Sequence, residues 1–410
     1  MVQRNPKIKA LRTHYLFPEI NKKKQEFLRR SPDAQLISLG IGDTTYPLPK
    51  SIANQLSLYG AGMSTLEGYS GYGPEQGNAG LRHLIASRFY PGLAEANEIF
   101  VSDGTKCDIG RLQVLFGSSA TIAVQDPTYP VYVDTAVALG QGEAQQEATG
   151  CYGNIVYMPC TSSNSFFPDL EALPRTDLIY FCSPNNPTGA VATHEQLARL
   201  IRFAKKNRSV VIFDAAYSAY IQDKTLPRSI YEIDGAREVA IELGSFSKMA
   251  GFTGLRLGWS VFPKELRFEG GESISTDWNR IHTTFFNGAS NIVQAAGAAV
   301  LEEEGWMAIK KMVEYYQENA LLLTHLCQEN EWQFYGGVHA PYLWVEFPGR
   351  DSWEVFDELL EQAHLVTTPG SGFGPSGNGF IRLSAFGLRE TIETAVQRGK
   401  KDSSRTSLRW

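Results

Sequence analysis

Apolar and polar positions alternate along the middle of the chain in two kinds of segment. Residues 194–206 repeat apolar positions every three or four residues, which is typical of an amphipathic helix. Strands that alternate with such helices predict an α/β fold: a mostly parallel sheet covered by helices on both faces. The short runs rich in apolar and β-branched residues, which have the length of buried strands, are 121–124, 178–182, 210–213 and 239–243.

Polar and turn-forming residues follow these predicted strands. In open α/β sheets, ligands bind beyond the carboxyl ends of the strands. We therefore expect a ligand site at this edge of the sheet. The residues that come next after the strands are Asp126-Pro127, Ser183-Pro184-Asn185-Asn186, Asp214 to Tyr217, and Ser245 to Lys248.

The pattern changes after about residue 287. This second part predicts helices over 292–328 (interrupted near Gly305), 352–363 and 390–397, and strands over 342–347 and 379–384. The mixture indicates a smaller α+β domain, which residues 15–39 join. The predicted division is an N-terminal arm with part of the small domain (1–42), a large domain (43–287), a C-terminal small domain (288–398) and a disordered tail (399–410).

Composition narrows the class of protein. The 410 residues are 43% hydrophobic and 20% charged, which is ordinary for a globular protein of two or three domains. A formal net charge of −6 argues against a nucleic-acid binder, because such proteins usually carry a basic excess. The five cysteines form no C-x-x-C pair and no ligand-like spacing with histidine, and their odd number and low density indicate free thiols in a reducing compartment. With a polar first segment and no run of roughly 18 apolar residues, the chain is expected in the cytoplasm, without a metal or a membrane partner.

The segment from Ser245 to Gly258 carries the strongest chemical signal. Lys248 lies eight residues before Arg256, and the hydroxyls of Ser245 and Ser247 precede it. A desolvated lysine forms a Schiff base with a carbonyl, while hydroxyls and an arginine fork bind phosphate. For a short Ser-x-Ser-Lys match, a solvated loop is the ordinary alternative. The whole segment, however, resembles the pyridoxal-5′-phosphate (PLP) attachment pattern of class I and II aminotransferases.

Three further residues suit a PLP ring. A carboxylate at Asp214 would keep the pyridine nitrogen protonated, and Tyr217 and Asn186 would hydrogen-bond the phenolic oxygen. Each has an ordinary alternative alone, such as a turn cap for Asp214 or a Pro/Asn turn for Asn186. Their order with Lys248 and Arg256 resembles fold-type I aminotransferases of the aspartate aminotransferase class over nearly the whole chain.

The resemblance assigns roles to other residues. It places Thr105 and Lys106 at a phosphate-binding helix N-terminus, Tyr129 on the cofactor ring and Arg382 on the substrate α-carboxylate. It also implies that Tyr72 reaches the phosphate of a second subunit, so that the protein is a homodimer with shared sites. For each residue alone, a core aromatic or a structural ion pair is the alternative.

Longer strings resemble the LL-diaminopimelate aminotransferase family. That resemblance implies amino transfer between L-glutamate and tetrahydrodipicolinate, which gives LL-diaminopimelate for lysine biosynthesis. Lys248, Asp214 and Tyr217 would then be catalytic, with Lys248 moving the proton of the substrate Cα. The strings begin at Tyr15 (YLFPEI), Leu39 (LGIGDTT), Glu67 (EGYSGYGPEQG), Phe286 (FNGASN) and Thr368 (TPGSGFG).

The same resemblance outlines a substrate pocket. Glu75 from a second subunit is implied to bind the distal ammonium, although an exposed Glu at a helix start is its ordinary alternative. Asn287 would also come from the second subunit and lie near cofactor and substrate. The other residues implied to shape the pocket are Tyr15, Gly42, Lys106, Tyr129 and Asn186.

Three other functions stay open on the sequence alone. They are another class I aminotransferase (aspartate, aromatic or alanine type), a PLP-binding regulator without turnover, and a PLP lyase or decarboxylase of the same fold. The string Gly372–Gly377 matches G-x-G-x-x-G, but it precedes a strand and contains a proline. We therefore expect a flexible loop near the substrate mouth there, and not a dinucleotide site.

Overall fold

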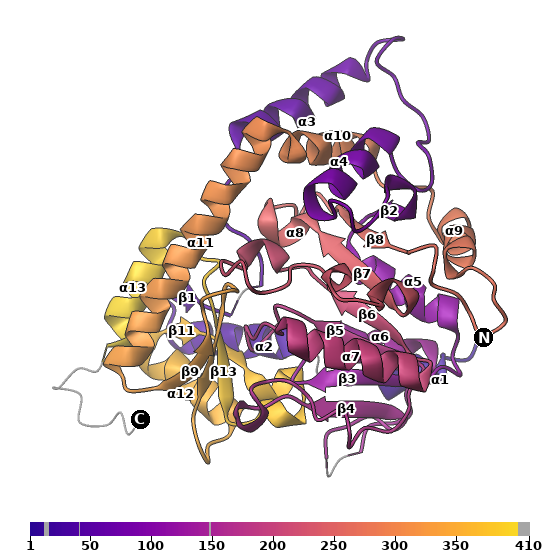
Figure 1. The fold of residues 1–410 in the computed structure, drawn as a ribbon. Helices are drawn as coiled ribbons and strands as arrows, with labels where there is room; N and C mark the ends of the chain where they lie inside the picture. Colours follow the sequence, from indigo (N-terminus) through magenta and orange to yellow (C-terminus); the bar gives the residue numbers. More distant parts are fainter. Residues whose placement is uncertain (12–15, 41, 147–148, 401–410) are drawn as a thin grey trace.

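The computed structural model describes residues 1–11, 16–40, 42–146 and 149–400 (Figure 1). A seven-stranded sheet forms its larger part. Strand β8 runs antiparallel to both of its neighbours, and the other strand pairs of this sheet are parallel, so the prediction of a mostly parallel sheet is confirmed. In spatial order the strands are β2 (Ile99–Ser102), β8 (Gly258–Val261), β7 (Ala240–Ser245), β6 (Val210–Asp214), β5 (Leu178–Cys182), β3 (Ile122–Asp126) and β4 (Ile155–Pro159).

Helices cover both faces of this sheet, as predicted. Successive strand residues point to opposite faces, so Leu178 and Tyr180 of β5 enter one core while Ile179 and Phe181 enter the other. One face packs against α5 (Thr105–Phe116), α6 (Val131–Leu139) and α9 (Ile274–Phe285). The other packs against α4 (Ala79–Phe89), α7 (His194–Asn207) and α10 (Asn291–Leu301).

A second core lies in the C-terminal part of the chain. The N-terminal residues from Leu16 to Leu39 belong to this core, and β1 (Ile37–Ser38) pairs with β11 (Leu365–Val366). Its antiparallel sheet has the order β12 (Thr368–Pro369), β13 (Phe380–Ser384), β10 (Tyr342–Glu346) and β9 (Gln333–Gly336). Its helices are α2 (Leu16–Arg30), α12 (Ser352–Ala363), α13 (Arg389–Gly399) and part of α11 (Glu303–Glu329).

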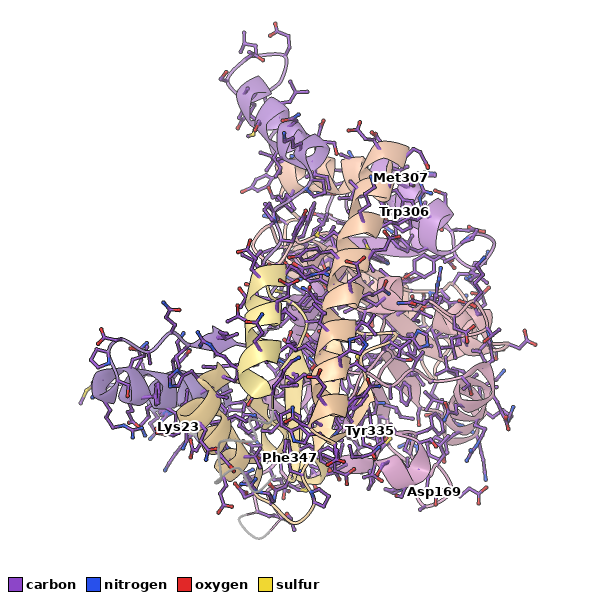
Figure 2. All side chains as sticks on the ribbon, turned by 90° about the vertical axis from the view of Figure 1, so that its left-hand side faces the viewer. Lys23, Asp169, Trp306, Met307, Tyr335 and Phe347 are labelled. Atoms are coloured by element: carbon purple, nitrogen blue, oxygen red, sulfur yellow. The ribbon has the colours of Figure 1, made fainter. Side chains whose placement is uncertain are left out.

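Helix α11 connects the two parts. It runs from the end near α3 (Lys50–Gly62) and α10 to the small sheet (Figure 1). In Figure 2, Trp306 lies near its first end and Tyr335 of β9 beside its other end. The proposed domain boundaries at 42/43 and 287/288 are compatible with this arrangement and stay a proposal, and residues 401–410 of the proposed tail lie outside the described chain.

The long helix predicted over 292–328 is two helices, α10 and α11, separated by the extended backbone of Glu302. The interruption was expected near Gly305, but this glycine lies inside α11. A Cβ at Gly305 would lie 1.9 Å from the carbonyl oxygen of Ala299. The glycine is therefore needed for close packing of the two helices, while the break itself occurs three residues earlier. Among the described helices, none is long and apolar enough to cross a membrane.

Candidate active site

A cavity of about 460 Å³ lies where the carboxyl ends of the large sheet face the small sheet. Residues far apart in the sequence meet there because β3, β5, β6 and β7 all end at this edge. The predicted site residues that line the cavity are Gly42, Thr105, Lys106, Tyr129, Asn186, Asp214, Tyr217, Ser245, Ser247, Lys248, Arg256 and Arg382.

Lys248 belongs to the short helix α8 (Phe246–Met249), which follows β7 directly. Its amine donates a hydrogen bond to the carbonyl oxygen of Gly42 and lies 5.7 Å from the ring centre of Phe386. Burial lowers the pKa of Lys248 to about 8; nearby Asp43 raises it, and Arg382 and Arg256 lower it further. This lowering favours the neutral amine, which is the form that a nucleophile or general base requires.

The N-terminus of α5 forms an anion-binding corner with Arg256. Gly104, just before the helix, has φ +117°, and a Cβ there would lie 2.5 Å from Nη2 of Arg256. Only glycine thus lets the guanidinium approach the helix end, where backbone N–H groups and the helix dipole favour a phosphate. Ser245 and Ser247 line the same corner, and the Ser245 hydroxyl accepts a hydrogen bond from the backbone N–H of Ser247 at 3.1 Å.

Asp214 is the last residue of β6, and its carboxylate is held by two donors. The Tyr132 hydroxyl donates to Oδ2 at 2.7 Å, and the backbone N–H of Ala216 donates to Oδ1 at 3.0 Å. Burial raises the pKa of Asp214, and both hydrogen bonds oppose that rise. Sequence reasoning missed Tyr132. The available signal was a second tyrosine three positions after Tyr129, and the two rings meet edge to face with their centres 5.7 Å apart.

Arg382 lies on β13 and is only 1% exposed. It donates from Nη1 to Oδ1 of Asn186 at 2.7 Å and from Nη2 to the carbonyl oxygen of Gly40 at 2.9 Å. Its guanidinium carbon lies 4.4 Å from the ring centre of Tyr342 and 4.9 Å from that of Phe373. Nε has no hydrogen-bond partner among the described residues, and the side chain lines the cavity, so this buried cation is suited to an anionic ligand.

Sequence reasoning also missed the two rings that pack against Arg382. Tyr342 is fully buried on β10, and its hydroxyl lies 2.9 Å from the hydroxyl of Tyr217. Phe373 lies in the loop before β13. The sequence identified their segments but gave no sign that two rings from different elements would enclose one arginine.

Three predicted site residues lie away from this cavity. Tyr72, Glu75 and Asn287 are exposed and do not line it, and Tyr72 is 90% exposed. Tyr15 lies outside the described residues. Any contribution from Tyr72, Glu75 or Asn287 would therefore have to be made to a second copy of the chain.

The donors present fit PLP. The corner at α5 suits its phosphate, the carboxylate of Asp214 suits a protonated ring nitrogen, and the amine of Lys248 lines the same cavity as both. No cluster of potential metal ligands occurs among the described residues. The donors that line the cavity suit an organic cofactor with a phosphate and an aldehyde.

Comparison with known proteins identifies the family of the chain. Residues 34–398 match the family model for aminotransferase class I and II. The chain is 56% identical over 400 residues to the LL-diaminopimelate aminotransferase of Protochlamydia amoebophila (strain UWE25), covering 98% of this chain and 97% of the relative. It is 54% identical over 401 residues to the chloroplastic LL-diaminopimelate aminotransferase of Arabidopsis thaliana, covering 98% and 87%.

Solved structures share the fold. The L,L-diaminopimelate aminotransferase from Chlamydomonas reinhardtii superposes with a TM-score of 0.93 at 56% identity, over 97% of this chain and 98% of that one. An aspartate aminotransferase double mutant of Thermus thermophilus superposes with a TM-score of 0.82 at 23% identity, over 97% and 99%. At that lower identity, the likeness concerns the fold alone.

Proposed function

The chain belongs to the class I and II aminotransferase family, and from this premise we propose that it is a PLP-dependent LL-diaminopimelate aminotransferase. It interconverts LL-2,6-diaminopimelate and 2-oxoglutarate with tetrahydrodipicolinate and L-glutamate, a reaction of lysine biosynthesis. The observation that carries the proposal is one cavity that joins Lys248, Asp214 and Arg382 in a chain so similar to LL-diaminopimelate aminotransferases.

The residues around the cofactor have distinct tasks. When bound, PLP supplies an electron sink that stabilises negative charge at the substrate Cα. The amine of Lys248 holds the cofactor and then carries the Cα proton, for which its lowered pKa suits it. Asp214 keeps the ring nitrogen protonated. Asn186 and Tyr217 hold the phenolic oxygen, and Tyr129 packs on the ring.

A separate group binds the anions. Arg382 binds the α-carboxylate, because it is buried, cationic and already aligned by Asn186. Lys106 and Gly42 border the same cavity and shape the substrate pocket. The residues that hold the cofactor phosphate are Thr105, Ser245, Ser247 and Arg256.

The site is completed by a second subunit, and the protein is a homodimer. Exposed apolar side chains on α3 and the segment after it support this proposal, because an isolated surface rarely shows so many together. That part of the chain projects from the body of the molecule (Figure 1). In this arrangement Tyr72, Glu75 and Asn287 reach the partner's site, and Glu75 binds the distal ammonium of the substrate. The exposed side chains are Leu58 (70%), Met63 (38%), Leu66 (94%), Tyr69 (67%) and Tyr72 (90%).

We also propose a cytoplasmic location and small molecules as the chain's ligands. The five cysteines are free thiols in the structure, which suits a reducing compartment. The net charge of −6 is unfavourable for nucleic acid.

The decisive experiment incubates the protein with LL-diaminopimelate and 2-oxoglutarate and measures glutamate and the cyclised imine product. We expect both products in equal amounts, and a panel of other amino donors to react far more slowly. Lys248→Ala should lose at least about 10⁴-fold in kcat, because the covalent anchor and the proton carrier are the same group. Preferential turnover of aspartate, an aromatic amino acid or alanine would contradict the proposed substrate.

A further inference from the structure

The string Gly372–Gly377 has a structural role that its sequence did not reveal. It was expected to be a flexible loop, but it forms parts of two 3-10 turns, η6 (Gly370–Phe373) and η7 (Pro375–Gly377). Phe373 is 3% exposed. The loop is therefore packed, and its contacts lead to a residue of the large sheet.

That residue is Asp126, the last residue of β3, which is 4% exposed. Its carboxylate accepts the Ser376 backbone N–H at 3.2 Å (Oδ1) and 3.1 Å (Oδ2), and the Ser376 hydroxyl at 2.8 Å (Oδ2). Burial raises the pKa of Asp126 to about 6, and the hydrogen bonds from Ser376 oppose that rise. Among the described residues, the backbone N–H and the hydroxyl of Ser376 thus donate the hydrogen bonds that offset the cost of burying the Asp126 carboxylate.

The loop backbone fits closely around Asp126. Gly374 has φ +138°, and a Cβ there would lie 2.1 Å from Oδ1 of Asp126, so only glycine fits. A further hydrogen bond runs from the backbone N–H of Thr128 to the carbonyl oxygen of Phe373 at 2.8 Å. The contacts at Asp126 and Thr128 therefore fix the loop on both sides of Gly374.

Phe373 lies at the point where these contacts meet the site. Its ring centre is 4.9 Å from the guanidinium carbon of Arg382. It lines the 460 Å³ site cavity and also a neighbouring cleft of about 870 Å³. Thr128 and Pro130 line only the outer cleft, whereas Tyr129 lines only the site cavity. Phe373 therefore belongs to the wall between the two spaces.

We propose that Asp126 and Ser376 form a clasp between the large and small sheets, and that this clasp positions Phe373 so that it aligns Arg382 and separates the site cavity from the outer cleft. Asp126 and Ser376 are positioning residues in this scheme, since they act through Phe373. The inference rests on the proposed role of Arg382 in binding the substrate carboxylate.

The test measures the binding of glutarate, an unreactive dicarboxylate, to the PLP-loaded protein by calorimetry, together with KM, kcat and the melting temperature. For Ser376→Ala we expect glutarate Kd and substrate KM to rise about five-fold, which corresponds to the net contribution of one typical hydrogen bond. The change in kcat should stay below about two-fold, because the groups that handle the Cα proton are untouched. Asp126→Asn should have the same effect, and the double variant should be no worse than either single variant.

Ser352→Ala is the matched control. Ser352 is a buried serine that bonds the carbonyl oxygen of Gly377 at 3.3 Å and Oδ1 of Asn378 at 3.1 Å. It therefore supports the same loop from within the small domain. We expect this variant to lower the melting temperature and leave glutarate Kd unchanged.

A variant that already carries Phe373→Leu shows whether the clasp acts through Phe373. Phe373→Leu alone should weaken glutarate binding, and adding Ser376→Ala should weaken it no further while still lowering the melting temperature. An unchanged glutarate Kd in Ser376→Ala, or additive effects of Phe373→Leu and Ser376→Ala, would overturn the proposal. If the wild-type protein transfers amino groups but Ser376→Ala leaves glutarate Kd unchanged, only the clasp is contradicted. If the wild-type protein neither binds glutarate nor transfers amino groups, the proposed function is contradicted as well.

Discussion

Tyr132 shows how one hydroxyl controls the carboxylate proposed to face the cofactor. Asp214 is buried, so its ionised form depends on the hydrogen bonds from Tyr132 and Ala216. Tyr132→Phe should therefore raise the pKa of Asp214 and weaken both cofactor binding and kcat by about ten-fold. Equilibrium dialysis with PLP and steady-state kinetics would measure these effects.

Tyr180→Phe is the control for this prediction. The Tyr180 ring stacks on Tyr132 with ring centres 5.1 Å apart, but its hydroxyl is not one of the two donors that hold Asp214. Removing that hydroxyl should leave PLP affinity unchanged. Equal losses in the two variants would show that packing of the rings, and not the hydrogen bond to Asp214, is responsible.

Glu242 gives a prediction about stability and pH. This carboxyl group on β7 is buried and accepts hydrogen bonds from Tyr90, Ser229 and the backbone N–H of Ile230. Burial raises its pKa from 4.5 to about 7. The folded state thus binds the proton more tightly than the unfolded state, and this contribution to stability is complete below about pH 4.5 and is lost as the pH rises through about 7.

Glu242→Gln should reduce that pH dependence. Between pH 5 and pH 8, the wild-type protein should lose on the order of 3 kcal/mol more unfolding free energy than the variant. Urea unfolding at a series of pH values would measure the difference. Parallel pH profiles for the two proteins would contradict the assigned titration.

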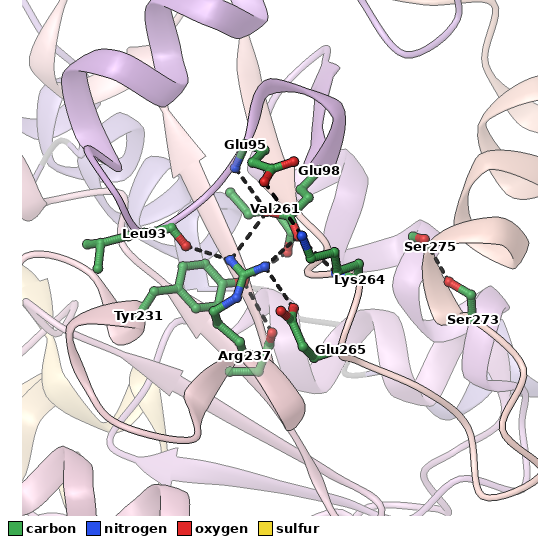
Figure 3. Close-up of polar contacts among 11 residues, drawn as sticks. Leu93, Glu95, Glu98, Tyr231, Arg237, Val261, Lys264, Glu265, Ser273 and Ser275 are labelled. Carbon is green, nitrogen blue, oxygen red and sulfur yellow. Dashed lines mark hydrogen bonds and ion pairs between the residues drawn. The ribbon is translucent and has the colours of Figure 1, made fainter.

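At the scale of elements, Arg237 links three segments at the edge of the large sheet, which contribute Leu93, Glu98 and Glu265 (Figure 3). It donates to Glu98 at 2.6 Å, to Glu265 at 2.7 Å and to the carbonyl oxygen of Leu93 at 2.5 Å. Glu98 is 4% exposed, so removal of Arg237 leaves a buried charge without its cation. We expect Arg237→Ala to lower the free energy of unfolding by about 3 kcal/mol.

Arg208 offers a comparison in the same protein. It pairs with Glu269, but the two side chains are 76% and 81% exposed, where water screens the charges. Arg208→Ala should change stability by less than about 0.5 kcal/mol. Denaturant unfolding of both variants would test whether burial decides the value of an ion pair here.

At the scale of the whole molecule, shared sites can be tested by mixing subunits. Lys248→Ala and Glu75→Ala should each be nearly inactive alone. Random reassociation of equal amounts makes about half of the dimers hybrids. If Glu75 acts on the partner's site, each hybrid contains one intact site of two. Activity should therefore recover to about a quarter of the wild-type value. The measurement is activity after dissociation and reassociation of the mixture.

Mixing Lys248→Ala with Asp214→Ala supplies the control. Both residues line the same cavity of one chain, so no hybrid of these two variants contains an intact site. Recovery in this control, or its absence in the mixture with Glu75→Ala, would contradict the shared arrangement.

The sequence by itself determined the elements and the chemistry. Apolar runs and helical spacing are local properties, so strands such as 178–182 and the helix 352–363 were predictable with their bounds. A place at the cavity was also predictable for Asn186, Asp214 and Lys248, because each ends or follows a strand whose carboxyl end must meet the others at one edge of a parallel sheet.

Only the tertiary structure decided which side chains act on these residues. Tyr132 donates a hydrogen bond to Asp214 over a separation of 82 positions in the sequence. The rings of Tyr342 and Phe373, which lie 40 and 9 positions from Arg382, enclose its guanidinium. The clasp joins Asp126 to Ser376, which are 250 positions apart. The contact between Asp126 and Ser376 depends on how the large and small parts of the molecule pack together, and the other contacts depend on how elements pack within one of these parts. No local pattern of residues encodes that packing, because every position in it is set by neighbours that the chain brings in from elsewhere.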